Sequence, residues 1–361
     1  MKLLGRFILA ILFSIAIIIS LSSEKETQPT LEENVISVTS SKQKGAHVFA
    51  RIDSSTLKTV SSLNINWMTL VSWGFQDNHK SSKLTHHNND SAYIKHHDSS
   101  WVERIRTARS AGFKVFLKPH IWIDQPIDGK WRNYIYPESE ADWENWQQRY
   151  TDFILRFAKI AALSDTDMFC IGTELSRLAV EKPLFWTDLI SKIRQIYKGK
   201  LTYAANWNKT YNEITFWDQL DVIGIQAYFP LTKTEFPSVD EIAMGWDKYI
   251  TNMATLSNTY NKQIVFTELG YKSTSGSAIH PWAWAEDPLN TDKTISEETQ
   301  ANCYKAFFET IWPQPWFAGV HIWQLRDNYS KNDRDYYYDF IPQGKMAEQV
   351  ISDAFAESSN Y

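Results

Sequence analysis

The sequence predicts a single (β/α)8 TIM barrel, and three observations support this fold class. Short apolar runs typical of strands alternate strictly with amphipathic helical stretches, giving eight such units within residues 45–357. The strand-like runs are almost continuously apolar, as in parallel sheets that helices cover. A Gly-rich phosphate-binding turn after an early strand, which is typical of open doubly wound sheets, does not occur in the sequence.

The elements follow one another in a regular order along the chain. The predicted strands are residues 46–50, 65–73, 114–118, 168–172, 201–205, 222–225, 263–267 and 318–322. The predicted helices are residues 54–62, 100–112, 139–163, 183–197, 213–220, 239–257, 296–311 and 344–357, of which 213–220 has the weakest pattern.

The N-terminus has the pattern of an export signal. Lys2 and Arg6 precede an apolar run over residues 7–21, after which the chain becomes polar. We therefore expect residues 1–23 to be a signal peptide, residues 24–44 to be a polar linker, and the protein to be periplasmic, cell-surface or secreted. The alternative is an uncleaved N-terminal anchor, which would be the one contact with a membrane, although the run is short for a membrane span.

Composition narrows the class of partner. The net charge of −5 and the lack of a Lys/Arg block argue against nucleic acid. The 16 Trp residues exceed the needs of an ordinary core, and their flat faces suit the C–H faces of sugars, with bulky packing as the alternative. Cys170 and Cys303 lie in apolar runs without a CxxC motif or a His at ligand spacing, so we expect two separately buried thiols, with a disulfide as the alternative, and no metal site.

Polar and aromatic residues follow seven of the eight predicted strands. The active site of such a barrel lies at the C-terminal ends of its strands, so these residues should meet at one mouth. The candidates are Trp73 after the second strand, Lys118, His120 and Trp122 after the third, Glu174 after the fourth, Asn206 and Trp207 after the fifth, Tyr228 after the sixth, Glu268 after the seventh and Trp323 after the eighth.

Two carboxylates matter most among these candidates. Glu174 and Glu268 each directly follow an apolar run, and they are 94 residues apart, which fits strands four and seven of a barrel. Those strands lie nearly opposite one another, so both side chains can converge on one bond. Cleavage of a glycosidic bond needs such a pair, one carboxyl as proton donor and one across the sugar ring. The alternative for either residue alone is a helix cap or a surface ion pair.

Several motifs resemble those of a known family. They are Phe-Leu-Lys-Pro-His-Ile-Trp at 116–122, Cys-Ile-Gly-Thr-Glu-Leu at 170–175, Ala-Asn-Trp at 205–207, Ile-Gly-Ile-Gln-Ala-Tyr-Phe-Pro-Leu at 223–231, Phe-Thr-Glu-Leu-Gly-Tyr at 266–271 and Pro-Gln-Gly-Lys at 342–345. With these motifs the chain resembles the clan A glycoside hydrolases, and more narrowly glycoside hydrolase family 113, whose characterised members are β-1,4-mannanases. The likeness covers nearly all of the chain after residue 44.

The resemblance implies roles for the candidates. It implies a retaining hydrolase of β-1,4-mannan or mannooligosaccharides, with Glu174 as acid/base and Glu268 as nucleophile, and without metal or organic cofactor. It also implies that Tyr228 hydrogen-bonds Glu268 and that Trp323 forms the platform under the sugar. A retaining hydrolase of another β-glycan and a non-catalytic glycan-binding barrel are the alternatives. Where many clan members have Asn before the acid/base, this chain has Thr173.

The remaining candidates have two interpretations each. Lys118, His120 and Asn206 are expected to bind sugar hydroxyls or to tune charge, with hydrogen bonds at the barrel rim as the alternative. Four tryptophans are expected to extend the stacking surface, with a packing role as the alternative: Trp73, Trp122, Trp207 and Trp284.

Two long segments interrupt the regular pattern. Residues 76–99 include His86-His87 and His96-His97, and we expect a solvated loop that shapes subsites, with a metal site as the weaker alternative. Residues 273–293, with Trp282 and Trp284, are expected to form a second loop over the same mouth.

Overall fold

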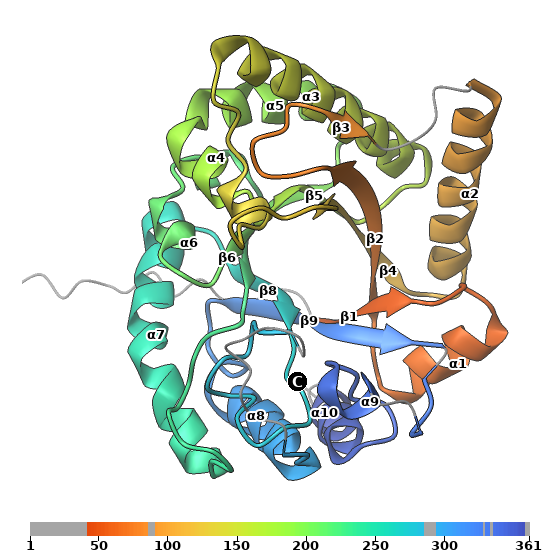
Figure 1. The fold of residues 1–361 in the computed structure, drawn as a ribbon. Helices are drawn as coiled ribbons and strands as arrows, with labels where there is room; N and C mark the ends of the chain where they lie inside the picture. The colour runs from red at the N-terminus through yellow and green to blue at the C-terminus, as the bar shows by residue number, and fades with distance from the viewer. Residues whose placement is uncertain (1–41, 86–90, 285–293, 328, 333–334, 358–361) are drawn as a thin grey trace, which may run out of the picture. The chain divides into compact units, whose positions relative to one another are not determined.

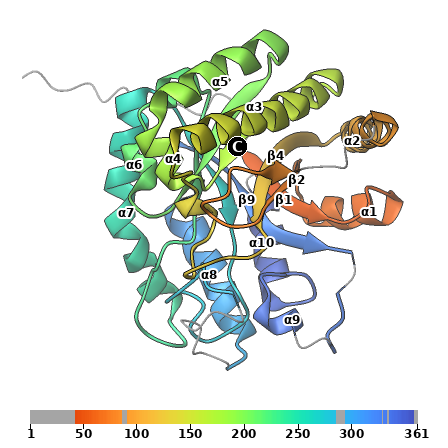
Figure 2. The same cartoon turned by 45° about the horizontal axis from the view of Figure 1, so that its top comes forward.

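Parallel strands form a closed sheet at the centre of the fold, with helices outside it (Figures 1 and 2). This computed structural model describes residues 42–85, 91–284, 294–327, 329–332 and 335–357, which all belong to one compact unit. The predicted signal peptide and nearly all of the predicted linker lie outside the described residues. In the described part of the chain, the sheet has nine strands in the order β1-β9-β8-β7-β6-β5-β4-β2-β3, and β1 also pairs with β2.

The pairing between β1 and β2 closes the barrel and confirms the predicted fold class. Strand β3 (Leu84–Thr85) pairs antiparallel with β2 and stands apart from the barrel. The eight parallel strands among the described residues are β1 (Gln43–Phe49), β2 (Trp67–Gln76), β4 (Lys114–Ile123), β5 (Met168–Thr173), β6 (Lys200–Asn206), β7 (Ile223–Gln226), β8 (Ile264–Leu269) and β9 (Phe317–Arg326).

Helices connect the strands on the outside of the barrel (Figure 1). The long ones are α1 (Ser54–Ser62), α2 (Ser91–Ser110), α3 (Glu140–Leu163), α5 (Pro183–Ile196), α7 (Val239–Tyr260), α8 (Glu297–Thr310) and α10 (Met346–Glu357). The shorter ones are α4 (Ser176–Glu181), α6 (Thr210–Glu213), α9 (Asp335–Tyr338) and the 3-10 turns η1 (Arg132–Tyr134) and η2 (Trp217–Gln219).

Local sequence signals explain where several helices begin and end. Asp53 caps α1 by accepting from two backbone N–H groups, and Ser139 caps α3 by accepting from the N–H of Asp142. Ser238 and Glu241 form a capping box at the start of α7, which ends at Asn261 in the left-handed conformation. The predicted boundaries of these helices are therefore close to the observed ones.

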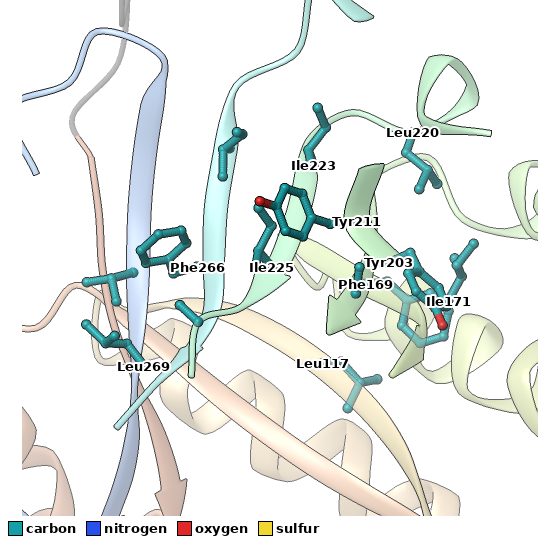
Figure 3. Close-up of a cluster of buried hydrophobic side chains, with 14 of the residues drawn as sticks. Leu117, Phe169, Ile171, Tyr203, Tyr211, Leu220, Ile223, Ile225, Phe266 and Leu269 are labelled. Carbon is teal, nitrogen blue, oxygen red and sulfur yellow. The ribbon is translucent and has the colours of Figure 1, made fainter. Parts of the chain in front are cut away.

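Alternation along the strands divides the core into two parts. Phe169 and Ile171 of β5 face outward and join the large cluster between the sheet and the helices, which Figure 3 shows in close-up. Met168 and Cys170 of the same strand belong to a second cluster, to which β2, β4, β6, β8 and β9 and Val222, just before β7, also contribute apolar side chains. Successive residues point to opposite faces of the sheet, so this second cluster fills the barrel interior.

Polar side chains replace this apolar filling above the second cluster. His321 of β9 is fully buried, with its Nδ1 2.6 Å from Thr69 Oγ1 and its Nε2 2.9 Å from Gln43 Oε1. A Cβ on Gly45 would lie 2.2 Å from the His321 ring, so glycine is required where β1 passes this imidazole. The polar interior is therefore packed as closely as the apolar one.

The structure corrects the prediction for the first long segment. Helix α2 starts at Ser91, so residues 91–99 of the predicted 76–99 loop are helical. His97 lies on α2 beside Asp98, which forms an ion pair with Arg156 of α3. His96 and His97 therefore lie in a helix that packs against α3. The pair His86-His87 lies outside the described residues.

Element ends are the other difference from the prediction. Strand β4 continues to Ile123, past the predicted end at Lys118, because its residues 119–123 pair in register with β2. The weak helix predicted at 213–220 is two short turns, α6 and η2. Strand β1 begins at Gln43, within the stretch predicted as linker.

The structure also shows the state of the two cysteines and the hydropathy of the described helices. Cys170 and Cys303 are both buried and free, as predicted. Among the described residues, no helix is both long enough and apolar enough to cross a bilayer.

We predict that His321→Gln flattens the loss of stability at mildly acidic pH. The pKa of His321 lies well below its ordinary value of 6.5, first because the ring is buried and then because His47 and Lys118 are near. Below pH 6.5 the imidazole of His321 therefore binds a proton in the unfolded chain but not in the folded chain. Above pH 6.5 the free energy of unfolding has its full value. Below pH 6.5 this free energy decreases as the pH decreases, by at most about 1.4 kcal/mol per pH unit for each such histidine.

Urea unfolding at about pH 7.5, 6.5 and 5.5 measures this slope. The slope of the His321→Gln variant should be smaller than that of the wild type by one such contribution. Thr69→Val disturbs the same buried place but keeps the imidazole, so it should retain the wild-type slope. Equal slopes for wild type and His321→Gln would contradict the assignment.

Candidate active site

Glu174 and Glu268 lie at the carboxyl ends of β5 and β8, where the barrel mouth opens. Glu268 belongs to β8 itself and is 3% exposed. Glu174 follows β5 directly, and its backbone N–H donates to the Ala204 carbonyl of β6 at 2.9 Å. The two side chains therefore start from opposite sides of the closed sheet, as the spacing in the sequence predicts.

Two buried donors hold the Glu268 carboxylate. Lys118 Nζ lies 2.5 Å from Oε1, and the Tyr228 hydroxyl donates to Oε2 at 2.7 Å. Each carboxylate oxygen thus has its own donor, which fixes the rotation of the group and supports its charge. The hydrogen bond from Tyr228 is the one that the resemblance implied.

Lys118 is fully buried on β4, and it contacts more than the carboxylate. Its Nζ also donates to Gln226 Oε1 at 2.8 Å and to the Thr267 carbonyl at 3.3 Å. Burial lowers the pKa of Lys118, whereas the charges of Glu268 and Glu174 act to raise it. Lys118 therefore acts on the nucleophile candidate and is too enclosed to be a simple rim residue.

The charges of both carboxylates influence the same two buried groups, Tyr228 and Lys118. Burial raises the pKa of Tyr228 well above its ordinary value, and the charges of Glu268 and then Glu174 add to this effect. The same two charges act on Lys118. The mouth thus brings together residues that are far apart in the chain.

Glu174 differs from Glu268 in its backbone and its partner. Its φ of 56° lies in the left-handed region, which a residue with a side chain rarely adopts. Its Oε2 accepts from Arg132 Nε at 2.8 Å and lies 2.7 Å from Arg132 Nη2. A strained backbone of this kind is concentrated at functional sites, where the surrounding structure maintains it.

Two neutral histidines face the Glu268 carboxylate. His120 Nε2 is 3.6 Å and His47 Nε2 is 3.9 Å from Glu268 Oε1. Burial first, and then the charge of Lys118, lowers the pKa of both rings well below 6.5. Among the described residues, neither ring nitrogen of His120 has a hydrogen-bond partner. Such buried and unpaired groups are suited to sugar hydroxyls.

An aromatic cleft of about 490 Å³ opens at the same mouth, and it is lined by Trp323 and Arg132 but by neither carboxylate. Trp323 is one wall, with its ring 5.1 Å from Phe49 and, nearly parallel, 6.2 Å from His120. Trp122 meets Trp131 edge to face at 5.0 Å on another side. The lining residues are Phe49, Trp73, Trp122, Trp131, Arg132, Trp284, Trp323, Gln324, Arg326 and Asp327.

Trp207 and Asn206 lie apart from this cleft. Trp207 stacks on Trp282 at 4.6 Å and 25°, so the second long loop packs against the end of β6. Asn206 Nδ2 donates to Ser176 Oγ at 3.0 Å, just after Glu174. The Thr173 hydroxyl donates to the Pro119 carbonyl, which makes it a link between β5 and β4.

The residues of the mouth that the sequence analysis missed include His47, Trp131 and Arg132. His47 is a polar residue in the apolar run of β1, two positions after Gly45, and the alternation of the strand could have placed it inside the barrel. Trp131 and Arg132 lie in an irregular segment after β4 that has no periodicity, so no local pattern could have placed them.

Other features of the molecule do not form a comparable site. Within the described residues, His, Cys, Asp and Glu side chains form no group of three or more that could hold a metal ion. A larger hollow of about 990 Å³ lies on the outer surface, along α2 and beside Leu163 at the end of α3. It contains neither the carboxylates nor the cleft aromatics.

The sequence decides the family. The profile described as Glycoside Hydrolase Family 113 matches residues 39–345. The chain belongs to glycoside hydrolase family 113. The enzyme is thus a glycoside hydrolase, and no curated protein matches it.

Solved structures share the fold of this family 113 enzyme. A family 113 β-1,4-mannanase has a TM-score of 0.74 at 24% identity, covering 88% of this chain and 99% of the other. The family 113 β-mannanase of Alicyclobacillus acidocaldarius, in complex with ManMIm, has a TM-score of 0.73 at 24% identity, with 89% and 99% covered. A β-glucuronidase of Faecalibacterium prausnitzii has 0.53 at 12% identity, with 88% and 49% covered.

We predict that Glu174→Gly is more stable than Glu174→Ala. Both variants lose the contact with Arg132, but only glycine removes the Cβ that strains a left-handed backbone. The difference in the free energy of unfolding should be about 1 kcal/mol. Glu268 provides the matched control, because in the extended strand β8 the alanine variant should be the more stable one by about 0.5–1 kcal/mol. Chemical denaturation of the four variants measures both differences, and an alanine variant at 174 as stable as the glycine variant would exclude backbone strain there.

Proposed function

We propose that this enzyme is a retaining hydrolase of β-1,4-mannan or mannooligosaccharides, with Glu268 as nucleophile and Glu174 as acid/base. The position of both carboxylates at the carboxyl ends of barrel strands, each held by a charged partner, carries the proposal. Membership of family 113 and the fold shared with two β-mannanases support the choice of mannan. The predicted export remains part of the proposal, because a polysaccharide substrate is extracellular.

The surroundings of Glu268 suit a nucleophile. The cation of Lys118 and the hydroxyl of Tyr228 contact its two oxygens and fix the orientation of the group. An ionised and oriented carboxylate can attack the anomeric carbon to form the glycosyl-enzyme bond. His47 and His120 are neutral and close enough to bind hydroxyls of the same sugar.

The position of Glu174 suits proton transfer. In the first step its proton goes to the glycosidic oxygen as the bond to the leaving group breaks, and in the second it takes a proton from the water that releases the sugar. Trp323 supplies a face beneath the sugar, and the other cleft aromatics extend this surface. Thr173 has its hydroxyl turned to Pro119, so the contact that Asn makes to the sugar 2-hydroxyl in many clan members is left to other residues.

A retaining hydrolase of another β-glycan is the second candidate, because the aromatic cleft and the carboxylates do not select one sugar. A non-catalytic glycan-binding barrel fits poorly, since both carboxylates and the donors around Glu268 are in place.

Hydrolysis of a polysaccharide panel tests the substrate and the stereochemistry together. We expect cleavage of β-1,4-mannan in preference to β-1,4-glucan and β-galactan, and NMR of the first-formed product should show the β-anomer. Preferred cleavage of another β-glycan would show that this glycan, and not mannan, is the substrate. An α-anomer formed first would mean inversion, and would overturn the assignment of Glu268 as nucleophile.

Truncation should separate the two glutamates. Glu268→Ala should abolish glycosylation with every leaving group. Glu174→Ala should lower cleavage of natural glycan by about 10²–10⁴-fold while sparing the first step with an acidic phenol, which leaves without a proton. Added azide needs no base, so it should restore turnover of Glu174→Ala as a β-glycosyl azide and give the α-azide with Glu268→Ala. The opposite azide stereochemistry would mean that the two roles are exchanged.

A further inference from the structure

Arg132 links the aromatic cleft to the acid/base candidate. Its guanidinium makes two contacts with Glu174 Oε2, at 2.8 Å from Nε and 2.7 Å from Nη2. The side chains of Arg132 and Glu174 are only 11% and 13% exposed. Contacts between charged groups are stronger in such a partly dry place than on an open surface. The contact between Arg132 and Glu174 is therefore stronger than an exposed ion pair on the surface would be.

The two glutamates depend on different parts of the fold for their orientation. Glu268 is held by Lys118 and Tyr228, which belong to the barrel strand β4 and to the end of β7. Within the described residues, Arg132 is the one side chain that donates to the Glu174 carboxyl. The rotation of that carboxyl is thus set from the segment between β4 and α3.

Aromatic and backbone contacts hold Arg132 in place. Its Nη1 donates to the Ile121 carbonyl of β4 at 3.5 Å, and its guanidinium carbon lies 5.7 Å from the centroid of the Trp131 ring. Trp131 in turn meets Trp122 edge to face. Arg132 and both tryptophans line the cleft, so a sugar bound there touches the segment that orients Glu174.

We propose that Arg132 is a positioning residue that decides which oxygen of Glu174 carries the catalytic proton. A carboxylic acid keeps its proton on one oxygen, and Oε2, which accepts from Arg132 Nε and has the cationic Nη2 2.7 Å away, is the unfavourable one for it. Because Arg132 occupies Oε2, the proton sits on Oε1, which is left for the glycosidic oxygen. After proton transfer the same contact holds the carboxylate for its task as base. This inference rests on the proposed role of Glu174 as acid/base.

The leaving group is the readout that separates this role from a structural one. A positioning residue for the acid matters only when the leaving oxygen needs a proton. For Arg132→Ala we expect kcat/KM on a mannooligosaccharide to fall by about 10²-fold, and kcat/KM on the 2,4-dinitrophenyl glycoside of the same sugar to stay within about threefold of the wild type. A plot of log kcat/KM against leaving-group pKa should be steeper for Arg132→Ala than for the wild type.

Arg177→Ala is the matched control. Arg177 contacts the same segment, with its guanidinium 3.7 Å from the Tyr136 ring centroid, but it pairs with Glu181 on α4 and is 47% exposed. Its loss should leave the dependence on the leaving group unchanged. Arg132→Lys keeps the charge without the two-pronged contact, and should recover only part of the lost activity on the oligosaccharide.

Glu174→Ala is measured alongside, so that the two proposals fail separately. If Glu174→Ala is not selective for the leaving group, the proposed function is wrong. The positioning role is overturned if Glu174→Ala is selective for the leaving group but Arg132→Ala lowers kcat/KM by the same factor on both substrates. It is also overturned if Arg132→Ala lowers kcat/KM on neither substrate. Thermal unfolding shows whether each variant is folded. If Arg132→Ala is not folded, the same comparison is made with Arg132→Lys. Equal effects of Arg132→Lys on kcat/KM for both substrates would then overturn the positioning role.

Discussion

The buried contact between Lys118 Nζ and Glu268 Oε1 is the constraint on which the mouth of the barrel depends. Two charges removed from water are costly unless further polar groups surround them. Gln226, Thr267 and Tyr228 provide these groups, and each comes from a strand or a strand end next to the pair. Loss of either partner would leave a buried charge without compensation, at a cost of about 3–5 kcal/mol.

Alternation along the strands explains how a polar cluster forms inside an apolar barrel. On β4, Phe116 belongs to the apolar interior, and Lys118, His120 and Trp122 follow it on the same face at steps of two. The face therefore changes from apolar filling to a charged group, then to a neutral imidazole, and then to an aromatic wall of the cleft. One strand thus contributes to the packing of the core, the charge at the nucleophile and the binding of the sugar.

Closure of the sheet sets the electrostatics of the mouth. His47 reaches Glu268 because β1 pairs with β9 as well as β2, which brings the first strand next to the last. Burial first, and then the charge of Lys118, lowers the pKa of His47 and of His120, so both rings are neutral beside an anion that would otherwise attract a proton to them. The anion thus keeps its strongest contacts with Lys118 and Tyr228, and the imidazoles stay available for hydroxyl groups.

The sequence by itself determined the barrel and the pair of glutamates, because strands have a period of two and active sites of barrels lie at strand ends. Glu174 and Glu268 could be found in this way because each directly follows an apolar run, and Tyr228 because it lies shortly after one. Helix α2 was partly missed because its first turns lack a clear apolar face, and tertiary packing on α3 decides that it is helical. Only the tertiary structure could bring Arg132 to Glu174, because an irregular segment has no periodicity and its contact across 42 positions forms only when the barrel closes.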